Sequence, residues 1–134
     1  MIAVDTSAIV AIAMREAEGR DFDELIVRER ALIGTPTLFE TRLVLGSLMP
    51  TFADAFLDAF IARSSIAVTD FTLEMYRAAA DAFSRYGKGQ RRRACLNFGD
   101  CFSYAVARTH SVPLLFKGND FVHTDLVPAY APVP

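Results

Sequence analysis

The sequence contains few of the residues that build disulfide-bonded or zinc-binding proteins. It has two cysteines, Cys95 and Cys101, and two histidines, His110 and His123, among 134 residues. Two cysteines are too few for a disulfide framework, and neither their spacing nor that of the histidines matches a metal-binding motif. We therefore expect the cysteines to be small, reduced residues, as is typical of a cytosolic protein.

Membrane and targeting signals are also missing. No apolar run approaches the roughly 20 residues that span a bilayer, and the N-terminus has no basic segment followed by an apolar signal core. The sequence therefore predicts a soluble, cytoplasmic protein with no membrane association. The formal net charge is −2, so the chain lacks the basic excess of proteins that bind nucleic acid by bulk charge. Any RNA binding must depend on a local basic patch or on metal ions.

Apolar residues are abundant, at 52% of the chain, which excludes a disordered protein and supplies a core. The length suits a single domain, which we expect to cover residues 1–134. Apolar runs that predict strands lie at 2–4, 31–33, 65–68 and 112–116, and helical stretches lie at about 8–16, 22–26, 36–49, 51–63, 72–86 and 98–109. Strands that alternate with helices predict an α/β fold with a parallel sheet covered on both faces.

Two aspartates follow predicted strands. Asp5 comes directly after the first strand, and Asp120 follows the last strand by a short turn. Ligands of open α/β sheets bind outside the carboxyl ends of the strands, so both side chains are expected at that edge. Taken singly, each is explained as well by a helix cap or a turn.

Two further acids lie in predicted helices. Glu40 shares a helix face with the apolar Leu43 and Val44, and a buried glutamate is costly unless it is paired or binds a metal. The alternative is a glutamate on a slightly rotated, solvated face. Asp100 lies near the start of an apolar helix, where the helix dipole alone also explains an aspartate.

Considered together, the four acids favour a metal site. Carboxylates that share one site repel each other, and their pKa values rise unless a cation neutralises them. Four carboxylates without a histidine cluster suit a hard cation that prefers oxygen ligands. The sequence therefore favours Mg²⁺ or Mn²⁺ over Zn²⁺.

The segments that carry these acids resemble the PIN-domain family, and within it the toxin ribonucleases of bacterial VapBC-type toxin–antitoxin pairs. The matching segments follow the family's order along nearly the whole chain. The most specific are the Asn-Phe-Gly-Asp-Cys block at 97–101 and the Gly-Asn-Asp-Phe turn at 118–121. The others are Asp-Thr-Ser-Ala at 5–8, Pro-Thr-Leu-Phe-Glu at 36–40, and Thr-Asp-Leu at 124–126.

The resemblance implies a PIN-like three-layer α/β/α sandwich with a central, mostly parallel sheet of four to five strands. The implied site consists of the catalytic residues Asp5, Glu40, Asp100 and Asp120, of which all but the glutamate hold Mg²⁺ or Mn²⁺, and of the supporting residues Thr6, Ser7, Asn119 and Asp125. The implied reaction is cleavage of an RNA phosphodiester by metal-activated water, which leaves a 5′-phosphate. The implied partners are RNA, a cognate antitoxin that lies across the active-site groove, and a second copy of the chain in a homodimer.

Two other segments allow both a functional and a structural interpretation. The glycine-containing loop before the Asn-Phe-Gly-Asp block carries four cations, Lys88, Arg91, Arg92 and Arg93. These predict a grip on the RNA backbone, or else a solvated loop without a ligand. The helix at 51–63 places phenylalanines at 52, 56 and 60, which indicates either core packing or an exposed apolar surface for a partner.

Three other functions remain open at this stage. A PIN nuclease of RNA processing would work without an antitoxin. A binding module could keep the fold without catalysis, although four intact acids argue against it. A receiver-like signalling domain also places acids, here including Asp70, and a lysine such as Lys117 at strand ends around Mg²⁺. It needs adjacent acids after its first strand, however, and Asp5 is followed by Thr6.

Overall fold

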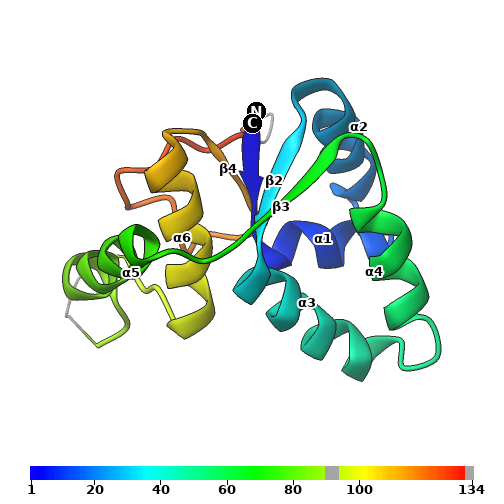
Figure 1. Ribbon diagram of the computed structural model, residues 1–134, viewed down its shortest axis with the longest axis horizontal. Coiled ribbons are helices and arrows are strands. Elements are labelled where there is room, and N and C mark those ends of the chain that lie inside the picture. The colour runs from blue at the N-terminus through cyan, green and yellow to red at the C-terminus, as the bar shows by residue number, and fades with distance from the viewer. Residues whose placement is uncertain (90–93, 132–134) are drawn as a thin grey trace.

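The computed structural model describes residues 1–89 and 94–131 and shows alternating strands and helices (Figure 1). The elements in chain order are β1 (Ile2–Val4), α1 (Thr6–Ala13), α2 (Gly19–Glu29), β2 (Ala31–Gly34), α3 (Thr35–Leu48), α4 (Ala53–Ile61), β3 (Ile66–Thr69), α5 (Leu73–Tyr86), α6 (Phe98–His110) and β4 (Leu114–Leu115). Each predicted strand and helix is present, with bounds that differ by a few residues.

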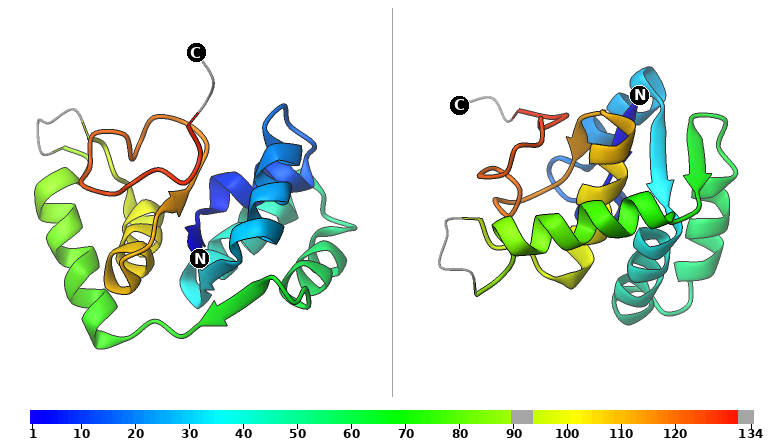
Figure 2. Two further views of the ribbon diagram at one scale, coloured as in Figure 1. Left: turned by 90° about the horizontal axis from the view of Figure 1, so that it is seen from above. Right: turned by 60° about the vertical axis from the view of Figure 1, so that its left-hand side comes forward.

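The four strands form one parallel sheet in the order β3-β2-β1-β4. In Figure 1, helices α5 and α6 lie on one side of this sheet and α1 to α4 lie on the other, and the view from above in Figure 2 separates the same two groups. This arrangement is the predicted three-layer α/β/α sandwich, and its four parallel strands fall within the predicted range.

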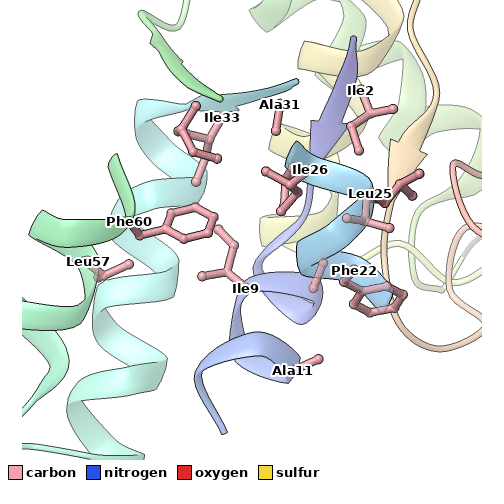
Figure 3. Close-up of a cluster of buried hydrophobic side chains, with 14 of the residues drawn as sticks. Ile2, Ile9, Ala11, Phe22, Leu25, Ile26, Ala31, Ile33, Leu57 and Phe60 are labelled. Carbon is pink, nitrogen blue, oxygen red and sulfur yellow. The ribbon is translucent and has the colours of Figure 1, made fainter. Parts of the chain in front are cut away.

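The alternation of side chains along the strands divides the core into two clusters. Ile2 and Val4 of β1 pack with the cluster under α1, α2 and α4, whereas Ala3 between them packs with the cluster under α5 and α6. Successive strand residues point to opposite faces, so a sheet covered on both faces needs apolar residues in an unbroken run. Figure 3 shows the first cluster, with Ile2, Ile9, Phe22 and other labelled side chains meeting between the sheet and its helices.

Three elements are shorter than the sequence predicted, and one of them is α4, which spans Ala53–Ile61 instead of about 51–63. Helix α1 ends at Ala13 because the chain reverses at Arg15, whose φ of 53° lies in the left-handed region. The last strand is limited to Leu114 and Leu115, which lie beside β1 at the sheet edge.

The phenylalanines in and just before helix α4 are of two kinds: some pack in the core and one is exposed at the surface. Phe60 is buried, and Phe56 stacks on it with ring centroids 6.0 Å apart. Phe52, just before the helix, is 64% exposed. The core interpretation is therefore confirmed for Phe60, while Phe52 belongs to the surface. Within the described chain, no helix is long and apolar enough to cross a membrane.

Candidate active site

A pocket of about 330 Å³ lies at the carboxyl edge of the sheet. Its walls come from the β1–α1 junction, α3, the start of α6 and the segment after β4. The lining residues are Asp5, Thr6, Ser7, Val10, Glu16, Glu40, Val44, Asn97, Asp100 and Lys117. Three of the four predicted catalytic acids therefore share one pocket, although 95 residues of sequence separate the first from the last.

Asp5 is the most rigidly held of these acids. It caps α1, and its Oδ2 accepts hydrogen bonds from the backbone N–H of Ser7 at 3.0 Å and from Ser7 Oγ at 2.6 Å. Its Oδ1 accepts a hydrogen bond from Ser103 Oγ on α6 at 2.6 Å. Asp5 is only 4% exposed, so these donors replace the water that an ionised carboxylate needs.

Glu40 extends from α3 into the same pocket. Its Oε1 accepts a hydrogen bond from Thr6 Oγ1 at 2.6 Å, and Thr6 in turn accepts one from Thr41 at 3.0 Å. Burial raises the pKa of Glu40, and the charge of Asp5 raises it further, while the Thr6 hydroxyl opposes the shift. The alternative of a solvated glutamate does not describe this half-buried side chain.

Asp100 is fixed by the N-terminus of α6. It forms a capping box with Asn97, in which each side chain accepts a hydrogen bond from the other residue's backbone N–H, at 2.9 and 3.0 Å. Burial raises the pKa of Asp100 to about 7, with contributions from the charges of Asp5, Asp120 and Glu40. A favourable interaction with the helix dipole explains why an aspartate begins α6. It does not explain why three other carboxylates lie near Asp100.

Asp120 occupies a different position from the other three. It lies exposed in the turn after β4 and does not line the pocket, although its charge reaches Asp100. Across residues 1–89 and 94–131, no group of three or more Asp, Glu, His or Cys side chains is arranged to hold one metal ion as it stands. The four acids therefore lie at one edge of the sheet, but their carboxylates do not surround a single position that a metal ion could occupy.

The predicted supporting residues separate into two groups. Thr6 and Ser7 lie in the pocket and hold Glu40 and Asp5 through their hydroxyls. Asn119 instead lines a neighbouring cavity of about 250 Å³, with mainly apolar walls. Asp125 accepts a hydrogen bond from Tyr104 Oη at 2.7 Å, away from the pocket, and so ties the C-terminal segment to α6.

The predicted RNA-binding loop is described only at its edges. Lys88 is exposed and does not line the acidic pocket. Arg91, Arg92 and Arg93 lie outside the described residues. Asp70, which a receiver-like site would need, is exposed after the edge strand β3 and does not line the pocket either.

Sequence reasoning missed several residues that shape the pocket. Ser103 binds Asp5 and Glu16 lines the wall, as does Lys117, which the sequence suggested only for a receiver-like site. A Cβ atom at Gly99 would overlap the carboxyl group of Glu40, so the first turn of α6 packs directly on that side chain. The only sequence signal for Ser103 was its spacing of three residues from Asp100, which places both on one face of the helix.

The chemistry of the pocket fits a hard divalent cation. Its donors are carboxylate and hydroxyl oxygens, which Mg²⁺ and Mn²⁺ prefer. The pKa values of Asp100 and Glu40 are raised by burial first and by repulsion from neighbouring carboxylates second. A cation would relieve that repulsion and keep both carboxylates ionised at neutral pH.

Comparison with known proteins identifies the family to which the chain belongs. A family model described as the PIN domain matches residues 2–126. Ribonuclease VapC30 of Mycobacterium tuberculosis is 37% identical over 96% of this chain and 98% of its own length. Ribonuclease VapC of Mycolicibacterium smegmatis is 39% identical over 92% and 95%.

Solved structures share the fold at lower sequence identity. Mycobacterium tuberculosis VapC20, described as a toxin that cleaves the sarcin–ricin loop, superposes with a TM-score of 0.77 at 20% identity, covering 98% of this chain and 100% of its own. VapBC2 of Rickettsia felis, bound to a DNA fragment of its promoter, gives 0.73 at 15% identity and covers 96% of each chain. These likenesses confirm the predicted fold class.

Proposed function

The chain belongs to the PIN-domain family and to its VapC ribonuclease group, and from this premise we propose that it is a metal-dependent endoribonuclease, the toxin of a toxin–antitoxin pair. The observation that carries the proposal is the convergence of Asp5, Glu40 and Asp100 in one pocket at the carboxyl edge of the sheet. We further propose that the domain comprises residues 1–134 and that RNA is its substrate.

In this proposal Asp5, Asp100 and Asp120 hold Mg²⁺ or Mn²⁺. Such a cation, when bound, would supply positive charge to offset the negative charge on the phosphate and would make the attacking water more acidic. Ser7 and Ser103 fix both oxygens of Asp5, so that this carboxylate keeps one orientation. Pre-set ligands of this kind avoid reorganisation during the reaction.

Glu40 is the proposed proton acceptor. Its pKa is raised by burial, which brings it closer to neutrality, and the Thr6 hydroxyl fixes one of its oxygens. The second oxygen packs against Gly99, where the chain leaves room for the carboxyl group but not for a side chain. Glu40 is therefore placed to take a proton from the attacking water.

The proposed protein partners are an antitoxin and a second copy of the chain. Large apolar side chains are exposed along α3 and just after it, namely Phe39, Leu43, Leu48 and Phe52. Glu40 and Val44 of the same helix line the acidic pocket, so a protein bound to this surface would lie next to the site. Exposed apolar groups of this kind mark interaction surfaces. The basic loop with Lys88, Arg91, Arg92 and Arg93 remains a proposed contact for the RNA backbone.

Cleavage of a mixed RNA pool in Mg²⁺ or Mn²⁺ tests the function. We expect the wild type to cut RNA, and Asp5→Asn and Asp100→Asn to lose this activity, because each change removes a charge from the cation site. Asp54→Asn is the matched control, since Asp54 is exposed and pairs with Arg42 outside the pocket. Full activity in both site variants would refute the assignment of the site.

Growth measurements separate the toxin from a nuclease of RNA processing. We expect expression of the wild-type gene to arrest growth, and co-expression of a neighbouring antitoxin gene to restore it. Asp5→Asn should leave growth unaffected. Normal growth with a catalytically active chain would contradict the toxin assignment while leaving the nuclease assignment in place.

A further inference from the structure

Lys117 connects the acidic pocket with the turn that carries Asp120. Its backbone N–H donates a hydrogen bond to Ser7 Oγ at 3.0 Å, and this hydroxyl donates to Asp5 Oδ2 at 2.6 Å. The position of residue 117 is therefore coupled to the carboxylate of Asp5 through one shared hydroxyl. Any displacement of the backbone at 117 would disturb the hydrogen bonds of Asp5.

The side chain of Lys117 provides a second attachment. Its Nζ lies 3.0 Å from Glu16 Oε2 and 3.2 Å from Glu18 Oε2, in the connection between α1 and α2. All three side chains are 31–39% exposed. A single surface ion pair contributes little stability. Here, however, the Lys117 ammonium group bridges two carboxylates, and the backbone N–H of Lys117 is also hydrogen-bonded.

The segment beyond Lys117 has little regular structure to hold it. Gly118 has a φ of 102°, which turns the chain sharply, and Asp120 follows two residues later. Asp120 is exposed, and its charge still reaches Asp100. The attachments of Lys117 on one side and the buried Phe121 on the other are therefore the fixed points that set the location of Asp120.

We propose that Lys117 is a positioning residue for the metal site, whose ion pairs with Glu16 and Glu18 hold the 117–120 turn so that Asp120 stays at the carboxyl edge of the sheet, within electrostatic reach of Asp100. This inference rests on the proposed function and deepens it. Glu16 lines the pocket, and its ion pair with Lys117 neutralises its charge. Lys117 acts through Asp120 and is not itself a ligand.

The direction in which removal of the Lys117 side chain changes cation affinity distinguishes a positioning role from a purely electrostatic one. Lys117 is the one cationic side chain among the described residues that line the pocket. Its removal makes the pocket more negative, and on Coulomb's law alone a divalent cation would then bind more tightly. A positioning role predicts the opposite, because the loss of a supporting contact in a metal site typically weakens binding about 10- to 100-fold.

The test is Mn²⁺ binding to the full chain, followed by electron paramagnetic resonance of the free ion and without RNA. We expect Lys117→Met to weaken binding about tenfold or more, and Lys117→Arg to restore part of the loss. Arg20→Met is the matched control, since Arg20 is an exposed cation paired with Glu24. Thermal unfolding of each variant verifies that it is folded.

A double-mutant cycle with Asp120→Asn tests the route of the effect. If Lys117 acts through Asp120, Lys117→Met causes no further loss in the Asp120→Asn background. Unchanged or tighter Mn²⁺ binding in Lys117→Met, or losses that add in the double variant, would overturn the proposal. So would an increase in the KM for RNA with unchanged Mn²⁺ binding, which indicates a direct contact with RNA. Asp5-dependent Mn²⁺ binding without RNA cleavage would refute the nuclease function alone.

Discussion

Gly99 is a residue whose lack of a side chain is part of the site. It lies in the first turn of α6, and a Cβ atom there would overlap the Glu40 carboxyl group. The displaced group is charged and held by Thr6, so it cannot move aside without losing that hydrogen bond. A methyl group at residue 99 would therefore displace the carboxyl group of Glu40, the proposed proton acceptor, although no acidic residue is substituted.

We expect Gly99→Ala to lower the rate of RNA cleavage at least tenfold while the protein remains folded. The reason is that Glu40 loses its place in the pocket, a loss that appears in kcat. Gly46→Ala is the matched control, because a Cβ at Gly46 meets only the flexible end of Arg42. Alanine there removes a helical glycine and should leave activity unchanged, with a gain in stability of up to about 1 kcal/mol. Equal activity in the two variants would contradict the role of Gly99.

The limits of sequence reasoning are visible at these residues. Asp5, Glu40 and Asp100 could be predicted because each has a local signal: a strand end, an apolar helix face or a helix start. Gly99 and Ser103 have no such signal toward their partners, since Gly99 packs on Glu40, 59 positions earlier, and Ser103 binds Asp5, 98 positions earlier. Contacts of this kind depend on how α3 and α6 pack on the sheet, which local pattern does not determine.

At the scale of elements, one polar cluster ties the C-terminal segment to two helices. Asp125 accepts a hydrogen bond from the buried Tyr104 and lies 3.6 and 3.4 Å from Arg85 and Arg108. Burial acts to raise the pKa of Asp125, but the Tyr104 hydrogen bond and the two arginines outweigh it and hold the pKa below its ordinary value. The predicted supporting role of Asp125 in the acidic site therefore competes with a clear structural one.

This cluster predicts an acid-sensitive contribution to stability. A carboxylate whose pKa is lowered by folding stabilises the protein above its unfolded pKa, near 3.9, and the contribution is lost as the pH falls through the folded value. We expect Asp125→Asn to be less stable than the wild type at pH 7 and to approach it as the pH falls through the lowered pKa of Asp125. Urea unfolding at several pH values measures this, with Asp70→Asn as the exposed control. A difference that does not depend on pH would exclude the ionised contact as the cause.

The elements themselves were more accessible to sequence reasoning than their ends. Unbroken apolar runs identify the buried strands, and caps such as Thr72 and the Asn97 capping box mark helix starts. The early end of α1 was not predicted, because Arg15 adopts a left-handed conformation that its residue type does not favour. That reversal directs Glu16 toward Lys117, a contact across 101 positions.

At the scale of the whole molecule, the acidic site lowers the stability of the fold, because folding brings negatively charged carboxylates together and buries them. Burying Asp5 and Asp100 together opposes folding, in line with the raised pKa of Asp100, and a net charge of −2 provides no overall positive charge to offset this cost. A cation that binds the folded chain but not the unfolded one shifts the folding equilibrium by mass action. The stability of the protein should therefore depend on the same ion as its activity.

We expect Mn²⁺ or Mg²⁺ to raise the melting temperature of the wild type, and a chelator to reverse the change. At a free ion concentration of about 100 Kd the added stability is about 2.7 kcal/mol, which corresponds to a shift on the order of 5–10 °C for a domain of this size. Asp5→Asn and Asp100→Asn should lack the shift, because each removes a ligand, whereas Asp54→Asn should retain it. Asp100→Asn also removes a buried, repelled carboxylate, so its melting temperature without metal should match or exceed that of the wild type. An equal metal-induced shift in all four proteins would place the bound cation outside this pocket.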